Sequence, residues 1–121
     1  MARLRSAARK RRKPRHPLEI PQMRDMVDEA AGAAQLLKLL GNKHRLLILC
    51  CLMISREMTV GEIVSAIGLS QSALSQHLAR LRADGLVEFR RTSQVLHYRI
   101  VDGRAARIIE LLKDLYCGTA T

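Results

Sequence analysis

Aromatic side chains are nearly missing from this chain of 121 residues. It contains two tyrosines, one phenylalanine and no tryptophan, so aromatic residues make up 2% of the sequence. Three rings are too few for the stacking platform that binds single-stranded bases, and we do not expect that mode of binding. Hydrophobic residues amount to 48%, so the core must come from aliphatic side chains, which favours packed helices.

Long apolar runs are missing too. No stretch of about 18 consecutive apolar residues occurs, so we expect no membrane-spanning helix. The basic N-terminus lacks the apolar segment of a secretory signal. Cysteines in a chain without such a signal predict free thiols in a reducing compartment, and hence a cytoplasmic protein. The three thiols are Cys50, Cys51 and Cys117.

The sequence features of an enzyme are also absent. There is no glycine-rich phosphate loop and no pair of carboxylates in a pocket pattern. His44 precedes Cys50 by six residues on one predicted helix, which is the wrong spacing for a Cys–His dyad. A single domain of this size leaves little room for a cofactor. We therefore predict a protein that is not an enzyme and that needs no cofactor.

Acidic residues are missing from the N-terminus. Residues 1–17 hold eight Lys and Arg and no Asp or Glu, whereas residues 18–121 hold thirteen basic and eleven acidic residues. The charge run, together with three prolines, predicts a disordered basic tail over residues 1–21. This tail is either an arm that touches DNA or a dispensable segment. A transit peptide and a true start at Met23 are further alternatives.

Helical periodicity follows the tail. Apolar residues recur at steps of three and four from Met23 to Leu40 and predict a first helix that ends at Gly41. Asn42 stands at the N-cap position of a second helix over residues 43–54. This second helix is apolar nearly all round, so we expect it to be central and buried.

Two shorter helices come next. Thr59 and Glu62 have the spacing of a capping box, which opens a helix over residues 60–66. Ser70 stands at the N-cap position of another helix over residues 71–84. A glycine lies between the two helices, so a tight turn between them is predicted.

The period then changes to that of strands. After Gly85, residues 86–91 and 95–100 alternate as two strands around a short turn, which predicts a hairpin with an arginine-rich edge. Asp102 can cap a last helix over residues 103–117. The predicted order is therefore α-α-α-α-β-β-α.

Two short helices joined by a turn and followed by a hairpin form a winged helix-turn-helix, a mainly α fold with a small β-hairpin. The folded domain spans residues 22–117, and residues 118–121 form a C-terminal tail. In this motif the second short helix lies in the major groove of DNA, with its N-terminal residues near the base edges.

The predicted reading helix begins with small polar residues. Gln can pair with adenine through two hydrogen bonds, and Ser lets the helix approach closely. Arginines of this helix and of the hairpin, Arg82 among them, can reach phosphates. The alternative, that these polar residues are only a solvated helix face, would leave the basic hairpin unexplained. His77 is either a phosphate contact or a packing residue. The DNA-binding candidates are Gln71, Ser72, Ser75, Gln76, His77, Arg80, Arg90 and Arg91.

The reading-helix segment, residues 69–87, resembles the recognition-helix signature of the ArsR/SmtB family of bacterial repressors. Residues 40–46 are similar to the family's entry to the second helix, and residues 97–100 fit its wing. The resemblance covers about residues 24–117. It implies a homodimeric winged-helix repressor whose first and last helices form the interface. Such a dimer presents two reading helices about 34–36 Å apart, so double-stranded DNA with an imperfectly palindromic operator is the expected partner.

The resemblance also bears on the signal that the family member senses. Metal-sensing members carry Cys-x-Cys in the first short helix or Asp and His ligands on the last helix. Here residues 60–66 contain no cysteine and residues 103–117 contain no histidine, so we expect no metal site. A soft metal bound by three converging cysteines stays an alternative.

The cysteines match another subgroup, the persulfide- and redox-sensing repressors. In that subgroup one cysteine of the second helix and one of the last helix form the sensor pair, which implies Cys50 and Cys117 here, with reactive sulfur species as the signal. A direct disulfide requires Cα atoms within about 7 Å, and a wider gap could admit a polysulfide bridge. Cys51 is expected to be structural. The alternative is a constitutive or anti-silencing DNA-binding regulator with general redox sensing or none, since buried cysteines often serve as small hydrophobic residues.

Overall fold

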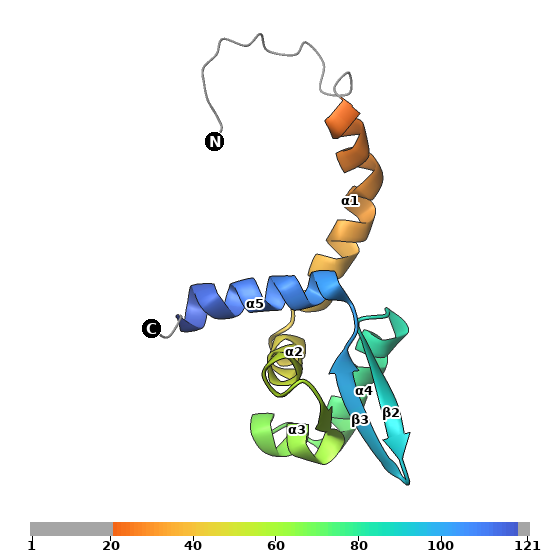
Figure 1. The fold of residues 1–121 in the computed structure, drawn as a ribbon, viewed down its shortest axis with the longest axis vertical. Coiled ribbons are helices and arrows are strands. Elements are labelled where there is room, and N and C mark those ends of the chain that lie inside the picture. The colour runs from red at the N-terminus through yellow and green to blue at the C-terminus, as the bar shows by residue number, and fades with distance from the viewer. Residues whose placement is uncertain (1–20, 119–121) are drawn as a thin grey trace. The chain divides into compact units, whose positions relative to one another are not determined.

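The computed structural model describes residues 21–118 (Figure 1). The predicted tails lie outside the described residues, except that Pro21 begins the first helix and Gly118 caps the last. The mainly α winged-helix fold is confirmed. One element was not predicted, a strand of two residues called β1. The elements are α1 (Pro21–Leu40), α2 (Lys43–Ser55), β1 (Met58–Thr59), α3 (Val60–Ile67), α4 (Gln71–Ala83), β2 (Val87–Thr92), β3 (Val95–Ile100) and α5 (Gly103–Cys117).

The chain divides within α1 into two units, Met1–Gln35 and Leu36–Thr121. In residues 21–35 of the first unit, every side chain except that of Met23 is exposed. Apolar side chains are among them, since Met26 is 64% exposed and Val27 is 56% exposed. This part of α1 thus presents apolar surface to its surroundings.

The second unit holds one aliphatic core, to which the last turn of α1, all later helices and the strands contribute. Helix α2 lies at its centre and packs on α3, α5 and β3. Its burial is less complete than predicted, because Leu47 is 38% exposed and Ile54 is 68% exposed. The fully buried side chains of the core include Leu39, Ile48, Leu49, Leu52, Ile63, Leu74, Leu78, Leu81 and Ile109.

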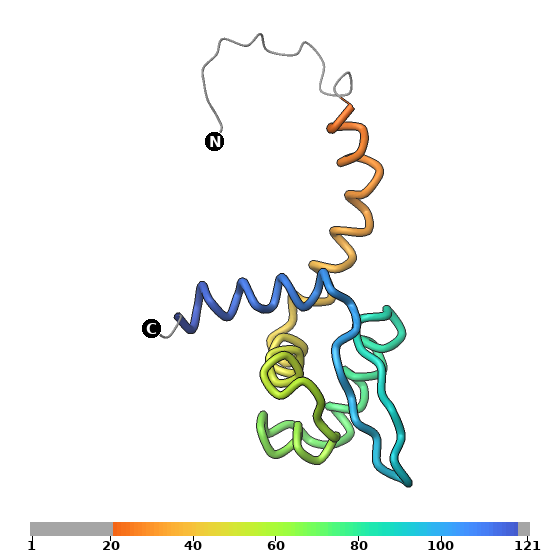
Figure 2. Tube along the Cα trace, viewed as in Figure 1, coloured from red at the N-terminus to blue at the C-terminus, as the bar shows by residue number. Residues whose placement is uncertain are grey.

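The strands form an antiparallel sheet in the order β1-β3-β2. Strand β1 pairs Met58 with Tyr98 of β3, and β2 begins with Val87 opposite Ile100. The hairpin of β2 and β3 runs beside α4 as a projecting wing (Figure 2). Its turn contains Ser93 at a φ of 58°, a left-handed conformation that favours glycine.

Candidate nucleic-acid interface and thiol pair

Local hydrogen bonds set the two helices of the helix-turn-helix. The Thr59 hydroxyl accepts from the Glu62 N–H at 3.2 Å, and the Glu62 carboxylate accepts from the Thr59 N–H at 2.9 Å. Gly68 then ends α3 at a φ of 79°, which only glycine adopts without strain. The Ser70 hydroxyl accepts from the Ala73 N–H at 3.1 Å and opens α4. All of these caps follow the sequence prediction.

Helix α4 separates its apolar and polar residues by face. Leu74, Leu78 and Leu81 are buried in the core. The predicted base-reading residues Gln71, Ser72, Ser75 and Gln76 are all exposed, and their side chains have no hydrogen-bond partner within residues 21–118. Their donors and acceptors are therefore available to an external partner.

Two of the predicted phosphate ligands are held by acids of the same chain. Arg90 donates from Nε and Nη2 to the Glu57 carboxylate, both at 2.9 Å, and from Nη1 to the Thr92 hydroxyl. This fork lowers the pKa of Glu57. Arg80 lies 3.4 Å from the carboxylate of Asp84. Half of the charge predicted for phosphate contacts is thus offset internally.

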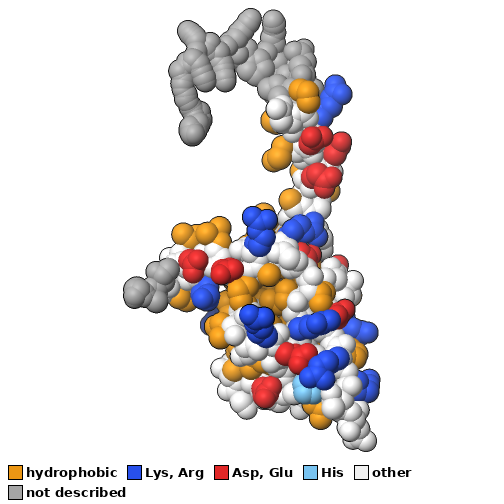
Figure 3. All heavy atoms as spheres, viewed as in Figure 1, with side chains coloured by type: hydrophobic (Ala, Val, Ile, Leu, Met, Phe, Trp, Pro, Cys, Tyr) orange, Lys and Arg blue, Asp and Glu red, His pale blue; other side chains and the backbone are white. Residues whose placement is uncertain are grey.

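Two other arginines gather on the single phenylalanine. The guanidinium carbon of Arg82 lies 4.5 Å from the Phe89 ring centroid, and that of Arg91 lies 6.0 Å from it. Neither guanidinium has an ion pair in the described part of the chain. The sequence prediction did not include the contact of Phe89 with these guanidinium groups. An aromatic residue followed directly by arginines on a strand can indicate such a cation–π contact. Figure 3 shows one face of the second unit, on which Lys and Arg side chains lie among Asp and Glu side chains.

His77 differs from the other candidates of α4 because it is half-buried. Its ring centroid lies 5.9 Å from that of His44 on α2. Burial, and then the positive charges of Arg45 and His44, lower the pKa of His77. The His77 ring therefore forms a contact between α4 and α2.

Arg45 ties two helix ends together. Its Nε donates to the Leu39 carbonyl at 2.6 Å and its Nη2 to the Lys38 carbonyl at 3.3 Å, both at the end of α1. The Asn42 side chain accepts from the N–H groups of His44 and Arg45, each at 3.0 Å. The last carbonyls of α1 and the first N–H groups of α2 are therefore satisfied side by side.

The predicted sensor cysteines lie on helices that pack together, since α5 crosses α2 (Figure 1). Cys50 and Cys51 are half-buried and Cys117 is exposed, all as free thiols. Burial raises the pKa of Cys50, and so does the negative charge that Cys117 and Cys51 would carry, whereas Lys113 lowers it. Burial alone raises the pKa of Cys51. Cys50 and Cys117 thus belong to two helices that contact each other, and the charge of one thiolate affects the other thiol.

No group of three or more His, Cys, Asp or Glu side chains suited to a metal ion occurs between residues 21 and 118. The three cysteines therefore do not form a ligand set in this structure. None of the helices described is long and apolar enough to cross a membrane.

Comparison with known proteins gives a consistent answer. Residues 42–88 match the model of the arsR family of bacterial regulatory proteins. The chain is 47% identical to the transcriptional activator HlyU of Vibrio cholerae, over 78% of this chain and 87% of that protein. It is 38% identical to the biofilm growth-associated repressor of Xylella fastidiosa, over 81% of this chain and 87% of that protein.

The solved structures agree with the sequence relatives. The crystal structure of HlyU from Vibrio vulnificus matches with a TM-score of 0.74 and 46% identity, over 79% of this chain and 99% of that one. These relatives are transcriptional regulators and not enzymes, as was predicted for this chain. The chain belongs to the ArsR family of winged-helix transcriptional regulators.

Proposed function

We propose that the chain is a homodimeric repressor that reads an operator with α4 and releases it when sulfur bridges Cys50 to Cys117. The observation that carries the DNA-binding part is the exposed, unpartnered polar face of α4. The Gln amides and Ser hydroxyls of α4 have no partner within the described chain. They can therefore form hydrogen bonds with base edges without breaking bonds inside the protein. Each good pair would contribute about 1–3 kcal/mol of discrimination.

Gln71 and Gln76 are assigned to base edges, and Ser72 and Ser75 to close approach at the start of the helix. Arg82 and Arg91 are assigned to phosphates, because Phe89 holds both guanidinium groups without neutralising them. Arg80 and Arg90 contribute less to phosphate binding, since each already has a carboxylate partner. His77 acts by packing the reading helix on α2.

The homodimer is proposed from the apolar surface of the two terminal helices. Leu111, Leu115 and Tyr116 of α5 are 56%, 66% and 84% exposed. An exposed apolar face of this kind is typical of a protein–protein interface. A twofold dimer would place two copies of α4 one DNA turn apart, which requires an imperfectly palindromic operator.

The switch is proposed as a two-step exchange with inorganic polysulfide. Exposed Cys117 attacks first as a thiolate, which gives a chain Cys117–S–S–SH and releases hydrosulfide. Cys50 then attacks the first added sulfur, which gives Cys117–S–S–S–Cys50 and a second hydrosulfide. The two thiols lose two protons and two electrons, and the polysulfide takes up both electrons. The packing of α5 on α2, together with the influence of the Cys117 charge on Cys50, supports this pairing.

The bridge would tie α5 to α2 and disturb the spacing of the two reading helices. Specific and non-specific operator binding differ by about 4–10 kcal/mol, so a coupling of about 1–3 kcal/mol suffices for release.

The test is intact-mass spectrometry of the reduced protein before and after polysulfide, with peptide mapping and a parallel peroxide sample. A Cys50–Cys117 link with an added sulfur, formed by polysulfide and not by peroxide, is expected. Cys51→Ser should retain the link and Cys117→Ser should lose it together with operator release. If the Cys117→Ser protein still dissociates from DNA after polysulfide treatment, the proposed switch mechanism is wrong. A plain disulfide after peroxide would make it a general redox switch.

The second candidate is a constitutive or anti-silencing regulator, which the name of the Vibrio cholerae relative, a transcriptional activator, favours. Operator affinity would then be the same before and after polysulfide. The basic segment 1–17, outside the described residues, would contribute in this case by adding phosphate contacts. Its deletion should reduce the dependence of operator affinity on salt, and an unchanged dependence would reject the arm.

A further inference from the structure

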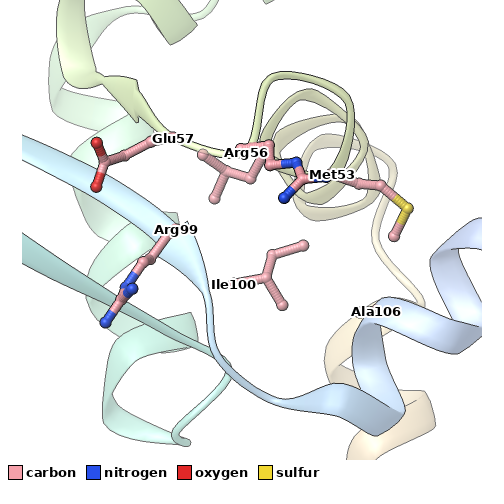
Figure 4. A pocket seen from close by; sticks show the side chains of 7 residues that line it. Met53, Arg56, Glu57, Arg99, Ile100 and Ala106 are labelled. Carbon is pink, nitrogen blue, oxygen red and sulfur yellow. The ribbon is translucent and has the colours of Figure 1, made fainter.

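A hollow of about 480 Å³ opens between the end of α2, β3 and the start of α5, and neither the cysteines nor the exposed residues of α4 belong to its lining (Figure 4). Its volume is within the range of sites for small ligands. Its apolar wall consists of Leu52, Met53, Ile100 and Ala106, and its charged residues are Arg56, Glu57 and Arg99.

Two of the three charged residues are already paired outside the hollow. The Glu57 carboxylate is held by Arg90 at 2.9 Å, and Arg99 donates to Glu88 at 2.7 Å. In Figure 4 the ends of both side chains point away from Met53 and Ile100. Arg56 instead extends beside Met53, and its guanidinium has no hydrogen bond or ion pair anywhere in the described chain.

The backbone of Arg56 is unusual as well. Its φ is 71°, in the region where a residue with a side chain is strained and glycine is favoured. A bulky arginine is thus kept at a position where glycine would end α2 with less strain. Strained non-glycine residues are concentrated at ligand sites, and this one lines the hollow with a free cation.

We propose that this hollow binds a small organic monocarboxylate with an apolar body. The Arg56 guanidinium would hold the carboxylate through paired N–H donors, a geometry that suits a planar anion. The apolar body would lie on Met53, Ile100 and Ala106. Because Arg56 is the one cation of this lining without a carboxylate partner in the described chain, a second negative charge on the ligand would lie against the apolar wall unpaired, which is unfavourable.

The site would connect three elements with different tasks. An occupant contacts the end of α2, the wing strand β3 through Ile100, and α5 through Ala106. It would therefore add contacts between the wing and the helix proposed for dimerisation. The sulfur switch uses other residues, so the two inputs would be chemically independent.

The test uses octanoate as the probe and the full reduced chain without DNA, so its outcome does not depend on the proposed operator or sulfur chemistry. Methionine-methyl NMR during titration should show a saturable shift of the Met53 signal, and calorimetry should give the matching affinity. Octylamine, which has the same chain and a positive charge, should not bind. Octanedioate should bind more weakly than octanoate.

Two variants separate binding from folding. Arg56→Gln should weaken octanoate binding about tenfold or more through loss of the charge-assisted bonds. Arg56→Gly should lose binding equally while its melting temperature rises, because glycine relieves the positive φ. Arg107→Gln, an exposed change on α5 outside the hollow, is the matched control and should bind as the wild type does. The absence of a saturable Met53 shift, or equal affinity in Arg56→Gln, would overturn the proposal.

Discussion

Helices α4 and α5 pack on the core in the same way but differ in the side chains that they expose. Each packs one apolar stripe on the core, Leu74 and Leu78 in α4, Ala105 and Ile109 in α5. The outer face of α4 carries glutamines and serines, whereas the C-terminal part of α5 exposes large apolar side chains, visible at its end in Figure 3. The inner faces account for the fold, and the outer faces are the ones that we propose for the partners, DNA at α4 and a second copy at α5.

The largest expected effect comes from placing a charge on the outer face of α5. Leu115→Glu should dissociate the dimer, because a desolvated carboxylate at an apolar interface is strongly unfavourable. Operator affinity should fall on the order of 100-fold, since a monomer presents a single reading helix. Sedimentation and operator titration measure the two effects. Leu115→Met is the control that keeps the face apolar, and a dimeric Leu115→Glu protein would remove the contrast with α4.

Neutralising the cations beside α4 should have a smaller effect. Arg82→Gln and Arg91→Gln should each weaken operator binding about fivefold near physiological salt and lower the slope of log affinity against log salt by about 0.9. Arg80→Gln should change the slope less, because Asp84 already pairs with Arg80. Operator titrations at several salt concentrations measure these slopes. Equal losses of operator affinity in all three variants would show that the Asp84 ion pair does not reduce the contribution of Arg80 to DNA binding.

The wing turn offers a gain in stability. Ser93 has a φ of 58°, so Ser93→Gly should raise the free energy of unfolding by about 0.4–1 kcal/mol through relief of strain. Denaturant unfolding measures the change, and Gln94→Gly in the same turn is the control. A destabilised Ser93→Gly protein would mean that the serine has a stabilising contact beyond its backbone.

The smallest expected effect is a pH dependence at the packing side of α4. The pKa of His77 in the folded protein lies below its ordinary value of 6.5, so the unfolded chain binds this proton more readily. The contribution of His77 to the free energy of unfolding should therefore be complete above about pH 6.5. It should be lost as the pH falls from there through the lowered pKa of the folded state.

His77→Gln should remove this part of the pH dependence between neutral and mildly acidic pH. Gln76→Ala, on the neighbouring exposed position, should keep it. Denaturant unfolding at a series of pH values makes the comparison. An unchanged slope in His77→Gln would place the titrating group elsewhere.

Local signals made most of the fold predictable from sequence. The caps at Asn42, Thr59, Ser70 and Asp102 all hold their helices as predicted. A cap is a contact within three residues, so its spacing is visible in the sequence. Strand β1 was not predictable, because two residues are too short for a periodic pattern and it exists only through its pairing with β3.

The candidate site was predictable as residue types but not as pairings. Arg90 and Glu57 are 33 residues apart, so no spacing indicates that one neutralises the other. The gathering of Arg82 and Arg91 on Phe89 likewise requires β2 to lie against the end of α4. The relation of Cys50 to Cys117 depends on the packing of α2 on α5, which the family resemblance implied and periodicity could not.

The corner between α1 and α2 has a mechanical consequence. The Arg45 guanidinium binds the final carbonyls of α1, while Asn42 binds the amide of Arg45 itself. Fraying of either helix end breaks bonds of the other, so the last turn of α1 and the first turn of α2 should open as one cooperative unit in amide hydrogen exchange. If a sulfur bridge at Cys50 displaced α2, the shared hydrogen bonds of Arg45 would transmit that displacement to the last turn of α1.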